Sequence, residues 1–267
     1  MQMNKVKFGI VAFFDILGFS QFAAVETDRE ITEAAEKLRG IILEIPEKVA
    51  KSETIRIPSH YLSGIEWRII SDSILLSKEF AADEYEWFHW LAFFRVCTGL
   101  MNLTFDYGFP LRGAISTGAF YIEEHSFVGK PIIDCHELSS CTQWAGCVVA
   151  PAAEERLQRI YLKQRTMEQV CVRYDVPMHG KERIERADYT KSLFTLKWFH
   201  DDLSRAPADI ALRIPNVVWE KFKAHKKEIP DSSNVMLKVG NTIKFLEYVN
   251  SLYYNSNEKR GPLNPND

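Results

Sequence analysis

VKFGIVAFFD, at residues 6–15, is a continuous apolar run that ends in an acidic residue. Strands that are covered on both faces of a sheet have this composition, because neither face meets water. ILGFS follows at residues 16–20, and Gly18 frees the backbone there for a tight turn into a helix. Backbone amides at such a helix start can hold phosphate oxygens. We therefore predict a buried strand that ends in Asp15 beside an anion-binding turn.

A second β-rich stretch is also interrupted by an acid. It is EWRIISDSILLS at residues 66–77, and the acid is Asp72, which lies 72 − 15 = 57 residues after Asp15. A charge within a buried strand is costly unless it is paired or bound to a metal. Mg²⁺ or Mn²⁺, which prefer oxygen ligands, would relieve the repulsion between two neighbouring carboxylates. The alternative is structural: Asp15 caps the turn and Asp72 pairs with an arginine.

The rest of the chain alternates between helical and strand patterns. Apolar residues recur at helical spacing over 31–45, shortly before Pro46, and an aromatic helix with Trp87, Trp90 and Phe94 on one stripe is expected to belong to the core or a dimer contact. The further expectations are a hairpin over 111–122 that turns at Thr117-Gly118, a helix from Gly129-Lys130-Pro131 to Trp144, strands at 169–177 and 192–199, helices near 214–227 and 235–253, and a disordered polar tail from Asn255. This order predicts an α+β fold with helices on a sheet.

The composition excludes several classes of protein. The 267 residues carry 33 basic and 36 acidic side chains, a net charge of −3, which gives no electrostatic footprint for nucleic acid. No apolar run approaches the roughly 20 residues that span a bilayer. The five cysteines match no zinc or disulfide spacing, so we expect buried thiols in a reducing cytoplasm (Cys97, Cys135, Cys141, Cys147 and Cys171).

Three motifs in this order resemble the class III nucleotidyl cyclases, the family of adenylyl and guanylyl cyclase catalytic domains. They are FFDILGFS at 13–20, RIISDSI at 68–74 and LRGAISTG at 111–118. The resemblance implies a catalytic core over 7–151 with a ferredoxin-like βαββαβ sheet. Residues 152–254 would form an extension of strands and helices packed on the core, followed by the tail, 255–267.

The resemblance also implies a site. Asp15 and Asp72 would hold two Mn²⁺ or Mg²⁺ ions, with the Ile16 carbonyl as a further ligand, and Arg112 would meet the triphosphate. The ions would activate the ribose 3′-hydroxyl and steady the departing pyrophosphate. The residues expected around the nucleotide are Phe14, Ile16, Leu17, Gly18, Phe19, Arg68 and Arg112. The alternative for Arg112 is a surface or strand-pairing arginine.

The departures from the family pattern indicate the substrate. Arg68 stands where purine cyclases carry a base-reading lysine, Ser126 replaces its acidic partner, and Ile133 and Glu137 replace an asparagine and an arginine. The segments 129–131, 143–146 and 174–177 look more like the Pycsar pyrimidine cyclases, which make cyclic UMP or cyclic CMP in response to phage infection.

Arginine offers only hydrogen-bond donors, which favours uracil with its two carbonyls over cytosine, and hence UTP over CTP. Arg68 and Asp72, four residues apart on one strand, would stand about 13 Å from each other on one face. One nucleotide could not meet both, so we expect a cytoplasmic homodimer with its sites at the interface. The alternatives are a cytidylate cyclase, an ion pair of Arg68 with Glu66 or Asp72, and a degenerate cyclase-like module that binds nucleotide. A nucleotide-polymerising relative would need a GG-acid-acid-F signature, which the sequence lacks.

Overall fold

A computed structural model describes residues 6–25, 27–51, 56–80, 86–123, 126–179, 189–198, 207–227, 229 and 234–258. The strands are β1 (Lys7–Ile16), β2 (Ile65–Ile70), β3 (Ser73–Glu79), β4 (Leu111–Glu123), β5 (Ser126–Val128), β6 (Gly146–Val149), β7 (Cys171–Met178) and β8 (Tyr189–Leu196). The helices are α1 (Phe19–Val25), α2 (Asp28–Ala50), α3 (Ser59–Leu62), α4 (Glu86–Asp106), α5 (Lys130–Cys141), α6 (Pro151–Lys163), the 3₁₀ helix η1 (Arg165–Gln169), α7 (Pro207–Lys223) and α8 (Asn234–Glu258).

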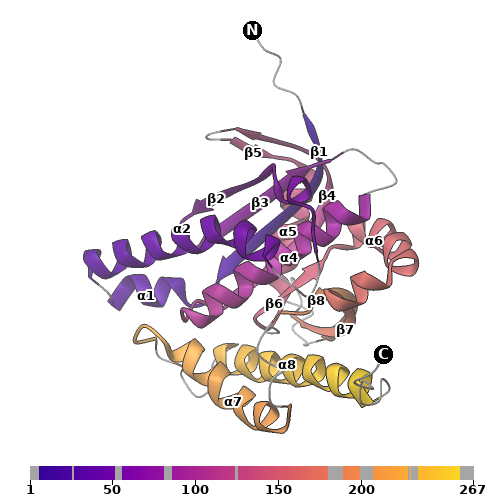
Figure 1. The fold of residues 1–267 in the computed structure, drawn as a ribbon. Helices are drawn as coiled ribbons and strands as arrows, with labels where there is room; N and C mark the ends of the chain where they lie inside the picture. The colour runs from indigo at the N-terminus through magenta and orange to yellow at the C-terminus, as the bar shows by residue number, and fades with distance from the viewer. Residues whose placement is uncertain are drawn as a thin grey trace.

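The strands form one sheet in the order β2-β3-β1-β4-β6-β8-β7, and β5 pairs with the far end of β4. Within β2, β3, β1 and β4, each strand is antiparallel to its neighbour. In the chain they alternate with helices as strand, helix, strand, strand, helix, strand, which together with this spatial order is the ferredoxin-like arrangement. The predicted α+β class is confirmed, and β1 lies inside the sheet with a partner strand on each side (Figure 1).

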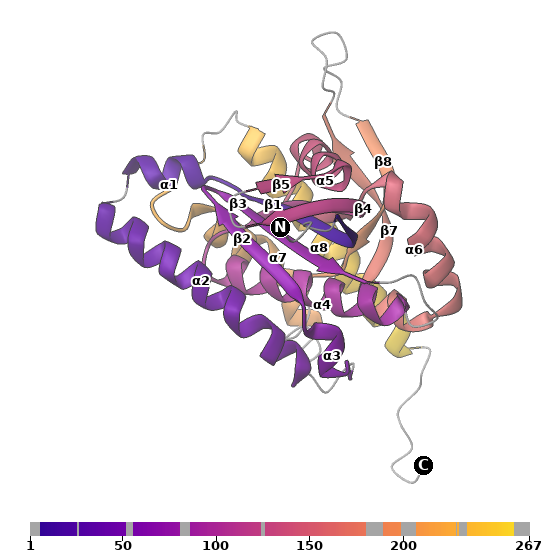
Figure 2. The ribbon, with the colours of Figure 1, turned by 90° about the horizontal axis from the view of Figure 1, so that it is seen from above.

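The central strand is covered on both faces, as its unbroken apolar run predicted. Ile10, Ala12 and Phe14 belong to the main core, on the side of α2 and α4. Val11 and Phe13 point to the opposite face, where α5 packs against β1 and β4. The view from above shows α5 and the pair α2 and α4 on opposite sides of the sheet (Figure 2). The α5 face holds the odd-numbered residues of β1, so it also holds Asp15.

Residues after 150 continue the same sheet. β6 pairs in parallel with β4, and β7 and β8 form an antiparallel pair beyond it. The helices α7 and α8 lie side by side beneath the lower ends of the central strands (Figure 1). The C-terminal region therefore covers the end of the sheet to which β1 delivers Asp15.

Several boundaries in the structure differ from those that the sequence pattern suggests. β4 does not turn at Thr117-Gly118 but runs straight through it, because the ten-residue β1 needs a partner of equal length and Thr117 donates its hydroxyl to the Gly9 carbonyl at 2.7 Å. α2 passes through Pro46, since Ile45 and Val49 on either side of it are anchored in the core. The other two boundaries are the end of α5 at Cys141 rather than Trp144 and the end of α8 at Glu258 rather than before Asn255.

The aromatic stripe of α4 is core, as expected: Trp90 and Phe94 are fully buried, and Trp87 is partly buried against the same core. The prediction of buried free thiols is confirmed for all five cysteines. Burial raises the pKa values of Cys97 and Cys147 well above that of an ordinary thiol, so these cysteines are poor nucleophiles.

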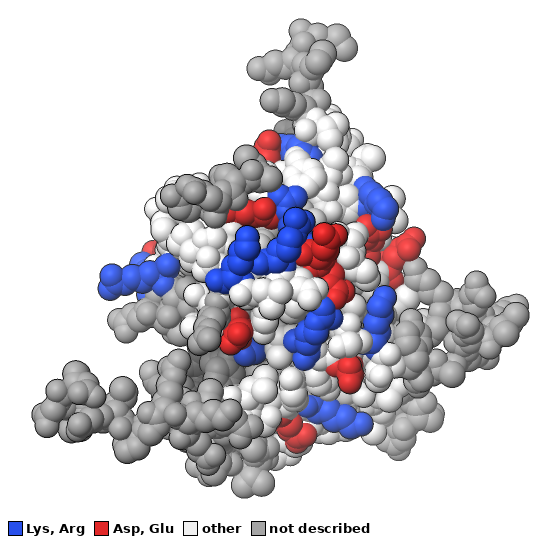
Figure 3. Space-filling model, turned by 90° about the vertical axis from the view of Figure 1, so that its right-hand side faces the viewer, with Lys and Arg blue, Asp and Glu red and all other residues white. Residues whose placement is uncertain are grey.

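No helix in the described part of the chain is long and apolar enough to cross a membrane. Charged side chains of both signs lie next to one another on the face that is at the right in Figure 1 (Figure 3). The ion pairs Arg156–Glu86 and Arg173–Glu154 each join opposite charges from different elements of the fold.

Candidate active site

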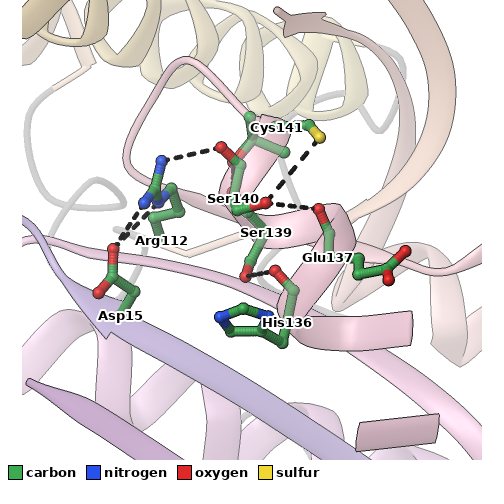
Figure 4. Close-up of polar contacts among 8 residues, drawn as sticks. Asp15, Arg112, His136, Glu137, Ser139, Ser140 and Cys141 are labelled. Carbon is green, nitrogen blue, oxygen red and sulfur yellow. Dashed lines mark hydrogen bonds and ion pairs between the residues drawn. The ribbon is translucent and has the colours of Figure 1, made fainter. Parts of the chain in front are cut away.

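Asp15 lies near the end of β1, directly between Ser73 of β3 and Arg112 of β4. Arg112 donates to one carboxylate oxygen of Asp15, Oδ2, through Nη2 at 2.7 Å and through Nε at 3.2 Å. Its third contact, from Nη1, is with the Ser140 carbonyl near the end of α5 at 3.3 Å (Figure 4). Both side chains are mostly buried, with 23% of Asp15 and 17% of Arg112 exposed. Arg112 therefore fixes the orientation of the Asp15 carboxylate.

Asp72 lies next to this pair, in the two-residue turn between β2 and β3. Its carbonyl accepts a hydrogen bond from the Ile16 N–H at 2.8 Å, which ties the turn to the end of β1. Ser71, the other turn residue, has a φ of 56°, a left-handed conformation that is unfavourable for a side chain other than glycine. Asp72 is thus a turn residue rather than the fourth residue after Arg68 along one strand, and the predicted spacing of about 13 Å does not apply.

The oxygen atoms in this corner fit a hard divalent cation. In the described part of the chain, the carboxylate of Asp72 has no hydrogen-bond or ion-pair partner, and Oδ1 of Asp15 also has none. The Asp72 N–H donates no hydrogen bond to the Ile16 carbonyl, so this turn leaves the Ile16 carbonyl oxygen without a donor. Mg²⁺ and Mn²⁺ prefer carboxylate and carbonyl oxygens of this kind.

No group of three or more histidine, cysteine, aspartate or glutamate side chains suited to a metal is found among the described residues. A site built on Asp15 and Asp72 would therefore need further oxygen ligands, from the Ile16 backbone and from a bound phosphate chain.

The turn after Asp15 has the predicted left-handed glycine: Gly18 has a φ of 79°. Two of its amides are already used, because Ile16 donates to Asp72 and Leu17 donates to the Pro110 carbonyl at 2.9 Å. Gly18 and Phe19, which lie at the start of the seven-residue α1, donate no backbone hydrogen bond within the described chain. The backbone amides left for an anion are those of Gly18 and Phe19.

The apolar residues predicted around the nucleotide do not expose their side chains. Phe14 and Ile16 are buried in the core, and Leu17 is also buried. Phe19 is half-buried and packs against Phe22 and Phe109. The side chains of Phe14, Ile16 and Leu17 hold the strand end in place, and the groups of these four residues that are left for a ligand are the Ile16 carbonyl and the Phe19 N–H.

Arg68 lies on the same face of the sheet as Asp15. It pairs with Leu75, which pairs in turn with Phe13, and Phe13 and Asp15 point to one side of β1. The alternative, an ion pair of Arg68 with Glu66 or Asp72, is not formed, and Glu66 is bound instead by Lys7. Arg68 donates only to the Trp67 carbonyl, at 2.8 Å, among the residues that the structure describes. Its guanidinium keeps most of its donors for another partner.

The C-terminal region brings two lysines to this corner that the sequence reasoning missed. Lys227 is buried, donates to the Gly108 carbonyl at 2.8 Å and lies against the Gly18 turn. Lys238, in the second turn of α8, is within electrostatic reach of both Arg112 and Asp15. The basic sequence KFKAHKK at residues 221–227, which contains Lys227, has the pattern of an exposed helix. This interpretation is wrong, because α7 ends at Lys223 and His225 stacks on Phe109.

Two lysines of the later strand region, Lys181 and Lys191, are weaker candidates for a phosphate ligand on the sequence alone. Lys181 lies outside the described residues. Lys191 is exposed on β8, four residues before Thr195, which pairs with Val148 of β6. This register carries Lys191 toward the end of the sheet that is opposite to Asp15.

Two solved structures have a similar fold. The adenylyl cyclase CyaB from P. aeruginosa has a TM-score of 0.46 and 14% identity, over 74% of this chain and 98% of that one. The non-canonical dimeric guanylyl cyclase domain of the RhoGC fusion protein from the aquatic fungus Blastocladiella emersonii has a TM-score of 0.41 and 13% identity, over 72% and 96%. No protein-family model and no curated protein matches the sequence. What the chain does must therefore be inferred from its own site residues.

Proposed function

We propose that the protein is a nucleotidyl cyclase that converts a pyrimidine nucleoside triphosphate, preferably UTP, into its 3′,5′-cyclic nucleotide and pyrophosphate. The observation that carries this proposal is the junction of β1, β3 and β4. There Asp15 and the turn that bears Asp72 are joined by the Ile16–Asp72 hydrogen bond, and Arg112 lies beside them. Two carboxylates and an arginine at one strand end suit a triphosphate that is bound with divalent cations.

The roles of the residues follow from their positions. Asp15, Asp72 and the Ile16 carbonyl would hold two Mn²⁺ or Mg²⁺ ions. When bound, the ions would lower the pKa of the ribose 3′-hydroxyl and neutralise charge on the phosphates. Arg112 orients Asp15 and presents a positive charge toward the same corner, and the amides of Gly18 and Phe19 offer donors for phosphate oxygens.

Arg68 is proposed to read the base in the site of a second copy. It lies on the face of the sheet that bears Asp15, but on β2, two strands away from β1. A two-fold dimer through this face would give each site the metal ligands of one chain and Arg68 of the other. Its free donors fit the O2 and O4 carbonyls of uracil, whereas cytosine presents an amine in place of O4.

A product assay with each of the four common NTPs and Mn²⁺ tests the chemistry. We expect cyclic UMP as the main product and its loss in Asp72→Ala with the fold preserved. Cyclic AMP as the main product would contradict the pyrimidine proposal.

Mixing two inactive variants tests the shared site. If Asp72 and Arg68 of different chains form one site, a heterodimer of Asp72→Ala and Arg68→Ala contains one intact site. Random exchange of subunits then restores roughly a quarter of the wild-type sites. If both residues serve the site of their own chain, no intact site forms and activity stays absent.

One observation favours a second candidate, a nucleotide-binding module without turnover. The positions that carry an asparagine and an arginine in the purine cyclases are held here by Ile133, which is 57% exposed, and by Glu137 on α5. UTP binding by a wild type that forms no product with any NTP and metal would support this module.

The resemblance to the Pycsar cyclases extends the first candidate to a second messenger in antiphage defence.

A further inference from the structure

The first turns of α8 are fastened to the segment that follows α5. The Asn241 amide donates to the Gln143 carbonyl at 2.9 Å. The Thr242 hydroxyl accepts from the Ala145 N–H at 2.8 Å and donates to the Lys238 carbonyl at 2.7 Å. This segment leads directly into Gly146, which pairs with Arg112 in the sheet. The start of α8 is thus held next to the strand that presents Arg112.

The packing of α8 against residues 143–145 directs Lys238 toward the site. It precedes Asn241 and Thr242 by three and four positions, so the three residues share one face of the helix. Side chains on a helix lean toward its N-terminus, so the Lys238 ammonium extends beyond the contacts that α8 makes with Gln143 and Ala145. The electrostatic neighbours of the ammonium are Arg112 and Asp15, in agreement with this placement.

The charges around Lys238 call for an anion. Partial burial lowers the pKa of the Lys238 ammonium, Arg112 lowers it further, and Asp15 raises it by less than these two effects. The ammonium forms no hydrogen bond or ion pair with any residue in the described ranges. Arg112 has already engaged Oδ2 of Asp15. Two cations therefore share one carboxylate, of which one oxygen is already engaged, and a multiply charged anion would relieve this arrangement.

We propose that Lys238 is a phosphate-binding residue, which contacts the triphosphate of the substrate together with Arg112 of the same chain. The substrate class in this assignment rests on the proposed cyclase function. The assignment gives the C-terminal helix α8 a direct part in the site, in cis, whereas Arg68 would act on the site of the partner.

Binding of the 1:1 complex of Mg²⁺ with inorganic tripolyphosphate, measured by calorimetry, tests the assignment without turnover. Lys238→Gln should weaken binding about tenfold or more, because a charge-assisted hydrogen bond is lost. Lys238→Arg should restore most of it. The matched control is Lys244→Gln, which removes an exposed lysine of the same helix and should leave binding unchanged.

Two results would overturn the assignment: no binding by the wild type, or equal binding by Lys238→Gln and Lys244→Gln. The cyclase proposal fails separately. A chain that makes no cyclic product but shows the expected binding series would refute the cyclase and retain Lys238 as a phosphate ligand. A Lys238→Gln variant that cyclises UTP with unchanged kcat/KM would refute the role of Lys238 and retain the cyclase.

Discussion

Arg112 donates two hydrogen bonds to the same oxygen of Asp15, Oδ2, and thereby turns the other oxygen away from itself. Asp72, one strand over, has no such partner among the described residues. The two carboxylates therefore differ in what they contribute to folding, although both are proposed metal ligands. This difference separates the effects of their substitution.

Asp72→Asn should abolish activity without loss of stability. The side chain makes no polar contact in the described chain, so its substitution breaks no hydrogen bond or ion pair. We expect product formation to fall by about three orders of magnitude, which corresponds to several kcal/mol of lost charge stabilisation. Urea unfolding should give an unchanged free energy. A stable variant with wild-type turnover would remove Asp72 from the site.

Asp15→Asn should lower both activity and stability. The substitution leaves the mostly buried Arg112 guanidinium without its counter-ion, at a cost of about 1–3 kcal/mol in the free energy of unfolding. The measurement is again urea unfolding, with Asp72→Asn as the matched control. Equal stability of the two variants would show that the Arg112–Asp15 pair does not support the fold.

Arg112→Lys keeps the charge but loses the planar fork that binds Asp15 and Ser140 together. We expect kcat/KM for UTP to fall roughly 10- to 100-fold, with the fold unchanged by circular dichroism. Wild-type kcat/KM in this variant would mean that only the positive charge matters.

Lys227 should make the stability depend on alkaline pH. Burial lowers the pKa of its ammonium from the usual 10.5 to about 8. Between these values the unfolded chain binds the proton that the folded chain has lost, so stability rises as the pH increases from about 8 to about 10.5. The gain is on the order of 2 kcal/mol.

The comparison that isolates this effect is between Lys227→Met and the exposed-site control Lys244→Met. The free energy of unfolding at pH 8 and at pH 10 should show the rise in the wild type and the control, and a smaller rise in Lys227→Met. The same rise in all three proteins would show that Lys227 titrates normally.

Gly18→Ala tests the turn after Asp15. Gly18 has a φ of 79°, and an added Cβ would lie 2.9 Å from Cδ of Lys227. The strained backbone and the displaced lysine should lower the free energy of unfolding by about 1–3 kcal/mol. Gly40→Ala, in α2 where a Cβ meets open space, should instead raise it by about 0.5–1 kcal/mol. A neutral Gly18→Ala would mean that the turn can rearrange.

The sequence predicted what depends on local pattern. The apolar run before Asp15 can only be a buried strand, and the acid that interrupts the next β-rich stretch indicates a turn or a site. Both were found at the same end of the sheet. The reversal of the chain between Ile70 and Ser73 was not predicted. These two residues fit the alternating pattern of a strand equally well whether the chain runs straight or turns between them.

The contributions of the C-terminal region could not be predicted in this way. No motif marks Lys227 or Lys238 in the sequence, and their places depend on the docking of the C-terminal segments against residues roughly a hundred positions earlier. The chain leaves the helix where His225 and Lys226 both adopt left-handed conformations, and neither residue type indicates such a break in the sequence. Long-range packing therefore decides which of many lysines approaches Asp15.

The position of α7 and α8 has a consequence for biosynthesis. The ribosome completes β1, β3 and β4 long before it reaches His225, which stacks on Phe109, and Lys227, which caps Gly108. Until then the strand ends that carry the two acids have nothing beneath them. A nascent chain would thus hold its proposed cation ligands early and gain Lys227 and Lys238 only later, so that turnover would await the synthesis and docking of α7 and α8.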